Sequence, residues 1–161
     1  MSEHQGAAPP KADRRPKGAV PYIVSPDCAA HIEWLKRALG AEAAGEVYHI
    51  PDDYEVAADW NKGGDPGKKP IVDAPVLING GPVYMCDNVD HEKKTAIGEA
   101  GPQGRGFMVH LSVPDPDALW ANVLKEGAKA KLDLKVQYWG AKFGVFEDPF
   151  GYQWSVSLDK E

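Results

Sequence analysis

The sequence carries one pattern twice, as VPYIVSPDCAAHIEWLKRALG at residues 20–40 and as MVHLSVPDPDALWANVLKEG at residues 108–127. Each copy begins with an apolar run typical of a strand, continues with an aspartate that can cap a helix, and ends with an amphipathic helix and a glycine. The copies start about ninety residues apart, which predicts two strand–helix–strands modules in one sheet system. A binding site is expected where the modules face each other.

Further strands are expected after each helix. In the first copy, a short strand is expected at 46–50, and the hairpin dipeptide Asn79-Gly80 separates apolar runs at 71–78 and 82–87. In the second copy, strands are expected at 129–137, 142–148 and 152–158. These strands complete the two modules.

The second copy ends in YWGAKFGVFEDPFGYQWS at residues 138–155. Together with the strand before Trp34-Leu35 and the HLSVPDPDALW segment, this ending resembles the vicinal oxygen chelate superfamily, which includes glyoxalases, bleomycin resistance proteins and dioxygenases. The nearest resemblance is to its PhnB-like branch, and it covers residues 18–158. It implies an α+β fold in which two βαβββ modules form a curved mixed sheet with a central cup, with helices on the outer face. It does not specify a reaction, because members of this superfamily carry out many different chemistries.

Composition limits the possible partners and compartments. The chain has 161 residues, a net charge of -6 and a pI near 5.4, which argues against nucleic acid as a partner. No apolar run is long enough to span a membrane and no signal peptide is visible, so a cytoplasmic protein is expected. Its two cysteines are too few for a disulfide framework.

One structural domain with four segments is expected. The segments are a disordered tail at 1–17, a first module at 18–87, a linker at 88–105 and a second module at 106–161. The Gly-, Pro-, Asp- and Lys-rich stretch at 51–70 is expected to be a long surface loop.

Strand alternation predicts which side chains line the cup. On the strand before each helix, Tyr22, Met108 and His110 are expected in the cup, and on the last strand Gln153 and Ser155. On the hairpin strand, matching Gly81 to Gly151 places Val83, Met85 and Asp87 there, with Cys86 on the helix side.

The resemblance implies where a metal would be held. Metal enzymes of the superfamily place His, Gln or Glu ligands at one cup position on each of four strands, and repeat matching assigns these positions to Val20, Met85, Met108 and Ser155. None of these residues is a usual ligand for a divalent ion. We therefore expect no metal and no other cofactor.

His110 is the one histidine with a reason to face the cup. A hydrogen-bonded structural histidine is the favoured interpretation, and an acid–base role is the alternative. Asp73 is a second weak catalytic candidate. His31, on the first helix, is expected to face solvent, and no Ser–His–Asp pairing is visible as a motif.

Aromatic residues give the clearest indication of binding. Trp34, Trp120 and Trp154 fit core positions, which leaves as walls of a ligand groove Tyr22, Trp60, Trp139 and Phe143. Met85 and Met108 would add apolar lining, and His110, Gln153 and Ser155 the polar contacts.

Three functions remain open from the sequence. The first is a small-molecule-binding protein without the usual metal ligands, one that sequesters a drug or metabolite. The second is an enzyme of the superfamily, an isomerase, lyase or dioxygenase, using His110, Asp73 or a displaced metal site. The third is a partner-binding scaffold. The resemblance also implies a homodimer.

Overall fold

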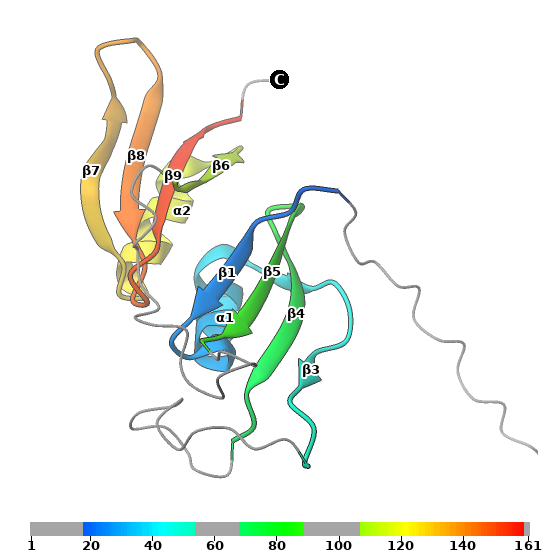
Figure 1. Cartoon of the computed structure of the whole chain (residues 1–161). Coiled ribbons are helices and arrows are strands. Elements are labelled where there is room, and N and C mark those ends of the chain that lie inside the picture. The colour runs from blue at the N-terminus through cyan, green and yellow to red at the C-terminus, as the bar shows by residue number, and fades with distance from the viewer. Residues whose placement is uncertain (1–17, 54–67, 89–106, 160–161) are drawn as a thin grey trace, which may run out of the picture.

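The computed structural model describes residues 18–53, 68–88 and 107–159 as two strand–helix–strands modules (Figure 1). The elements of the first module are β1 (Tyr22–Ser25), α1 (Cys28–Leu39), β2 (Glu42–Ala43), β3 (Tyr48–His49), β4 (Ile71–Ile78) and β5 (Gly81–Asp87). The elements of the second module are β6 (Val109–Val113), α2 (Pro116–Lys125), β7 (Lys129–Val136), β8 (Lys142–Glu147) and β9 (Gln153–Leu158). The predicted tail, most of the predicted linker and residues 54–67 of the long loop lie outside the described residues.

Each module has its own mixed sheet. The strand orders are β1-β5-β4-β2, with β3 also paired to β4, and β6-β9-β8-β7. In both sheets the strand before the helix pairs in parallel with the last strand, and the other pairs are antiparallel. This arrangement confirms the α+β fold of two repeated modules. Among the described residues, no helix is long and apolar enough to cross a membrane.

The helices begin where the sequence pattern places them. Asp27 accepts a hydrogen bond from Ala30 N at 3.0 Å, and Asp115 accepts one from Ala118 N at 3.0 Å. These bonds satisfy amide groups that have no partner within the first turn of a helix. Gly40 ends α1 in the left-handed conformation, with φ 65°, which costs little without a Cβ atom.

The hairpin between β4 and β5 is also confirmed. Asn79 and Gly80 have φ values of 50° and 77°, so both central residues of the turn have positive φ, as a type I′ turn requires. The turn fixes the register in which Pro75 lies opposite Tyr84 and Ala74 lies opposite Met85.

Strand pairing shows which residues of the two modules are equivalent. Counted back from the capping aspartates, Tyr22 corresponds to His110, and these two pair with Tyr84 and Ser155 respectively. Ser155 therefore corresponds to Tyr84 and not to Met85. The predicted match of Gly81 to Gly151 was wrong by one residue, because the two turns before β5 and β9 differ in length.

Because side chains alternate along a strand, an error of one residue assigns every side chain of β5 to the wrong face of the sheet. Met85 is 0% exposed and packs in the core with Ile23 and Leu35, so its predicted place in the cup was wrong. Asp87 also lies on the helix side, where its carboxylate accepts hydrogen bonds from Cys28 N and Ile71 N at 2.7 Å each. Tyr84 and Cys86 take the places on the cup face, defined here as the sheet face turned away from α1 and α2.

The core lies between the sheets and the two helices, which lie behind the sheets in Figure 1. As expected, Trp34 and Trp154 are buried, and Trp120 packs against the core. The modules contact each other directly: Trp34 Nε1 donates to the Glu126 carbonyl at 2.6 Å, and Asn122 Nδ2 donates to the Ala38 carbonyl at 3.0 Å. Each helix therefore supports the other module as well as its own sheet.

Candidate functional site

The cup face of the second module presents a histidine held by two serines. His110 Nδ1 lies 2.8 Å from Ser155 Oγ, and its Nε2 lies 2.9 Å from Ser157 Oγ. Ser155 is buried, whereas His110 is exposed. A neutral imidazole donates with one ring nitrogen and accepts with the other, so both serines can be satisfied at once. The pair of bonds fixes the plane of the ring.

A row of aromatic rings extends from this histidine. The His110 ring lies parallel to the Phe143 ring with centroids 6.1 Å apart, and Trp139 meets Phe143 edge-on at 5.7 Å. Trp139 is on the tip of the β7–β8 hairpin and is 50% exposed, and its neighbour Tyr138 is 97% exposed. The aromatic row, meaning Trp139, Phe143 and His110, therefore runs from the hairpin tip along the cup face.

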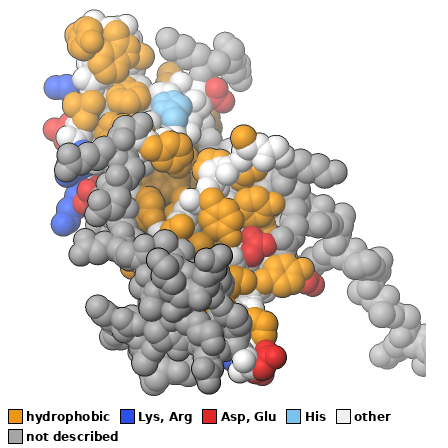
Figure 2. Space-filling model, in the orientation of Figure 1, with side chains coloured by type: hydrophobic (Ala, Val, Ile, Leu, Met, Phe, Trp, Pro, Cys, Tyr) orange, Lys and Arg blue, Asp and Glu red, His pale blue; other side chains and the backbone are white. Residues whose placement is uncertain are grey.

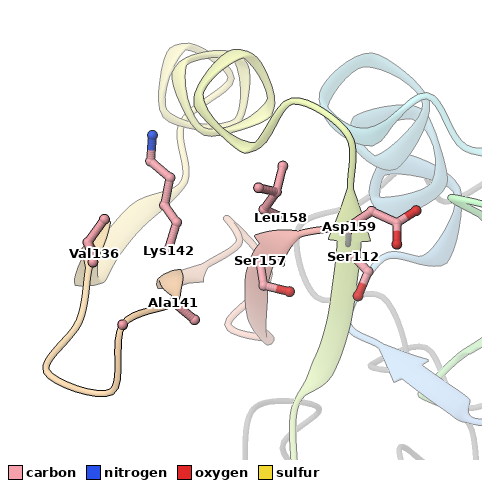
Figure 3. A pocket seen from close by; sticks show the side chains of 8 residues that line it. Ser112, Val136, Ala141, Lys142, Ser157, Leu158 and Asp159 are labelled. Carbon is pink, nitrogen blue, oxygen red and sulfur yellow. The ribbon is translucent and has the colours of Figure 1, made fainter. Parts of the chain in front are cut away.

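A pocket of about 600 Å³ lies beside this row, where β6 and β9 end and β8 begins. In Figure 3, Ser112 and Ser157 point to the same side of the sheet, while Lys142 and Leu158 point to the other side. Gly140 forms part of the wall and has a φ of 86°, with no atom within 4 Å of where a Cβ would lie. Ser157 links the pocket to the histidine, because it lines the one and bonds the other.

The cup face of the first module carries a phenol and a thiol. Tyr22 and Tyr84 stack with centroids 5.7 Å apart. Burial, with help from nearby Cys86 and Asp73, raises the pKa of Tyr22 to about 12. The Tyr22 residue is half exposed, but its hydroxyl donates to the Val72 carbonyl at 2.8 Å.

The Cys86 thiol also has a raised pKa. Burial and the neighbouring Asp87 carboxylate raise its pKa to about 11. Both Tyr22 and Cys86 are therefore neutral near pH 7, and they offer hydrogen bonds rather than a nucleophile. Asp73 lies close enough to influence both groups, and its catalytic role stays a prediction.

The remaining predicted ligand-binding residues fall into three groups. Met108 is exposed directly before β6, and Gln153 is half-buried beside Ser155 on the cup-face side of β9. Met85 is in the core. Trp60 lies outside the described residues.

In the view of Figure 2, hydrophobic side chains gather across the described surface with few charged groups among them.

The four positions where related metal enzymes carry ligands do not fit a divalent ion. With the corrected register these positions hold Val20, Tyr84, Met108 and Ser155, and the Ser155 hydroxyl is engaged by His110. Within residues 18–53, 68–88 and 107–159, no three His, Cys, Asp or Glu side chains are grouped to hold a metal. We therefore derive no chemistry through a metal.

The structure also contains a buried Ser–His–Asp group that was not predicted from the sequence. His31 is 0% exposed, so the prediction that it faces solvent was wrong. Its Nδ1 lies 3.1 Å from Ser25 Oγ, and its Nε2 lies 2.7 Å from Asp148 Oδ2. All three residues are buried on the helix side, away from the pocket, so no substrate can reach Ser25. The one signal in the sequence was a histidine on the apolar face of α1.

Comparisons with known proteins agree with this architecture. A family model described as the Glyoxalase/Bleomycin resistance protein/Dioxygenase superfamily matches residues 19–156. An uncharacterized protein of Mycobacterium bovis is 30% identical over an alignment of 142 residues that covers 84% of this chain and 79% of that protein.

Solved structures share the fold at low identity. The crystal structure of protein PA1353 from Pseudomonas aeruginosa aligns with a TM-score of 0.62 at 22% identity and covers 91% of this chain and 100% of its own. A Bacillus cereus protein described as a putative 3-demethylubiquinone-9 3-methyltransferase, PhnB protein, aligns with a TM-score of 0.61 at 14% identity and covers 88% and 99%. The chain therefore belongs to the glyoxalase/bleomycin resistance protein/dioxygenase superfamily, and PhnB-like proteins are among its structural neighbours.

Proposed function

We propose that this protein binds a small, flat and largely apolar molecule on the cup face of its second module, and that it sequesters a drug or metabolite in this way. The observation that carries the proposal is the exposed aromatic row that ends beside a pocket of about 600 Å³. Small-molecule sites typically have volumes of roughly 300–1,000 Å³ and combine apolar or aromatic surface with few polar groups. Here the aromatic surface is supplied by the row beside the pocket, because none of the described residues that line the pocket is aromatic.

The geometry supplies both parts of such a site. The half-exposed Trp139 ring provides apolar contact area, and the open backbone at Gly140 lets a ligand approach closely. Ser112 and Ser157 supply hydroxyl groups on the same side of the sheet.

The test is a thermal-shift screen of planar compounds followed by titration of each hit. Truncating an aromatic anchor typically weakens binding by about 2 kcal/mol, roughly thirtyfold in affinity. Trp139→Ala is therefore expected to raise the Kd about thirtyfold while it leaves the melting temperature of the free protein nearly unchanged.

Tyr138→Ala is the matched control, because Tyr138 is on the same hairpin tip but is 97% exposed. It should change the Kd by less than about threefold. If both variants lost the same affinity, or if Trp139→Ala lost none, the Trp139 ring would not be the specific anchor of the ligand.

A second candidate function is proton transfer, as in an isomerase or lyase. It is favoured by one observation: His110 is exposed on the cup face and bonds Ser157, which lines the pocket. A histidine in that place can move a proton to or from a bound ligand. Incubating each hit with wild-type and His110→Asn protein, followed by NMR of the ligand, decides this: turnover by wild type alone supports an enzyme.

We also propose that two copies of the chain form a homodimer. Tyr22 and Trp139 are about half exposed on the cup face, and a second copy would cover such surface. Light scattering at micromolar concentration is expected to give twice the 17.5 kDa chain mass. A mass of one chain would contradict it.

A further inference from the structure

The two modules meet at a fully buried histidine. His31 of α1 reaches across to Asp148, which directly follows β8 of the other module, with 2.7 Å between Nε2 and Oδ2. The ring is stacked against Phe150 at a centroid distance of 4.3 Å and against Tyr152 at 5.5 Å. Ser25 holds the other ring nitrogen at 3.1 Å. The two stacked rings and the two hydrogen bonds therefore fix both the position and the plane of the imidazole.

Asp148 organises the turn that leads into β9. Its Oδ1 accepts hydrogen bonds from Phe150 N and Tyr152 N at 2.9 Å each. Its Oδ2 accepts one from Trp154 Nε1 at 2.9 Å as well as the bond with His31. A carboxylate has about four acceptor sites, so all of them are used here. Two of the four partners flank the start of β9: Tyr152 directly precedes the strand and Trp154 is its second residue.

The same strand holds the cup histidine. Ser155, which directly follows Trp154, bonds His110 Nδ1, and Ser157 bonds its Nε2. Trp154 and Ser155 project to opposite faces of one strand. A shift of the turn at Asp148 would therefore move both hydroxyl groups that set the plane of the His110 ring, and one of them, that of Ser157, also lines the pocket.

We propose that His31 is a positioning residue for the ligand site of the second module. By holding Asp148 from the first module, it sets where β9 begins and so where Ser155 and Ser157 stand. The inference rests on the proposed function for its effect on binding, but its effect on His110 can be measured without any ligand. His31 itself contacts no ligand, because it is buried behind the sheet.

The test uses two substitutions of His31. His31→Phe keeps a ring against Phe150 and loses both hydrogen bonds, whereas His31→Gln keeps an N–H that can reach Asp148. The first readout is the NMR signals of the His110 ring nitrogens in the free protein. The second is the Kd for a hit from the thermal-shift screen. We expect His31→Phe to shift the ring signals and to weaken binding about tenfold, the equivalent of one hydrogen bond, and His31→Gln to restore both within about threefold.

Trp34→Phe is the matched control, because Trp34 is also buried and its ring donates another hydrogen bond between the modules, which does not involve the turn at Asp148. A purely structural role predicts that Trp34→Phe and His31→Phe change the His110 signals alike, at an equal loss of melting temperature. The proposal predicts a change in His31→Phe alone. Unchanged His110 signals in a folded His31→Phe protein would overturn it.

Two further outcomes are informative. If His31→Phe does not fold, Ser25→Ala replaces it, because this change removes only the partner of His31 Nδ1. It is expected to shift the His110 ring signals in the same direction but by less. Unchanged His110 signals in Ser25→Ala would equally overturn the proposal. If no ligand is found, the proposed function fails, while the His110 signals still decide the role of His31.

Discussion

The two modules have the same scaffold and different chemistry on the cup face. Both helices are capped by an aspartate at 3.0 Å, and both first strands pair in parallel with their last strands. On the cup face, however, Tyr22 and Tyr84 of the first module correspond to His110 and Ser155 of the second. The helix caps and the parallel pairing of the first strand with the last are thus kept in both copies, whereas the side chains of the cup face differ.

The side chains between helix and sheet differ between the modules as well, and there a larger residue on the helix is matched by a smaller residue on the strand. Where α1 and β4 of the first module have Ile32 and Ala74, α2 and β8 of the second have Trp120 and Gly144. A Cβ on Gly144 would lie 2.9 Å from Trp120 Cζ3 and 2.9 Å from Leu134 Cα. The larger helix residue therefore requires the smaller strand residue.

The largest expected difference between the modules concerns their histidines. His31→Ala removes a fully buried ring and leaves the Asp148 carboxylate without one of its partners. Loss of a partner from a buried polar network, with the cavity left behind, is expected to lower the free energy of unfolding by about 3 kcal/mol or more. His110→Ala, on the exposed face, is expected to cost about 1 kcal/mol. Urea unfolding of both variants checks this, and equal losses would contradict the comparison.

An intermediate effect is expected where the modules differ in packing. Gly144→Ala gives the second module the residue of the first and is expected to cost about 2 kcal/mol through overpacking. In the double variant with Trp120→Ile the contact with the ring is gone, so the added cost of the alanine should fall. It should not reach zero, since the contact with Leu134 Cα remains. Strict additivity in this double-mutant cycle would show that Trp120 is not the cause.

The smallest expected difference concerns the helix caps. Asp27→Ala and Asp115→Ala should each cost about 1 kcal/mol near pH 7. Asp27 also has Lys68 at 2.5 Å. Burial acts to raise the pKa of Asp27, but the hydrogen bonds from Lys68 and Ala30 outweigh it and hold that pKa below its usual value.

The pH dependence follows from that direction. A folded-state pKa below the unfolded value stabilises the protein above the ordinary pKa of about 3.9, and this contribution is lost as the pH falls through the folded value. The stability difference between wild type and Asp27→Ala should therefore shrink below about pH 4. Unfolding curves between pH 3 and 7 measure it, and a difference that grows on acidification would contradict the assignment.

Local patterns in the sequence determined most of the fold. The capping aspartates, the Asn79-Gly80 turn and the apolar periodicity act within a few residues, so they predicted α1, α2 and the β4–β5 hairpin close to their observed bounds. The repeat and the DPFG ending then identified the superfamily.

Only the tertiary structure decided two further features of the molecule, the face to which each side chain of β5 points and the contact between His31 and Asp148. The face of β5 depends on its pairing with β1, and an error of one residue moved Met85 from the core to the cup, because strand side chains alternate. The contact between His31 and Asp148 joins residues 117 positions apart, and no local preference of either residue specifies it. Sequence patterns with a short period therefore determine the elements, while hydrogen-bond register and packing between modules decide which side chains meet.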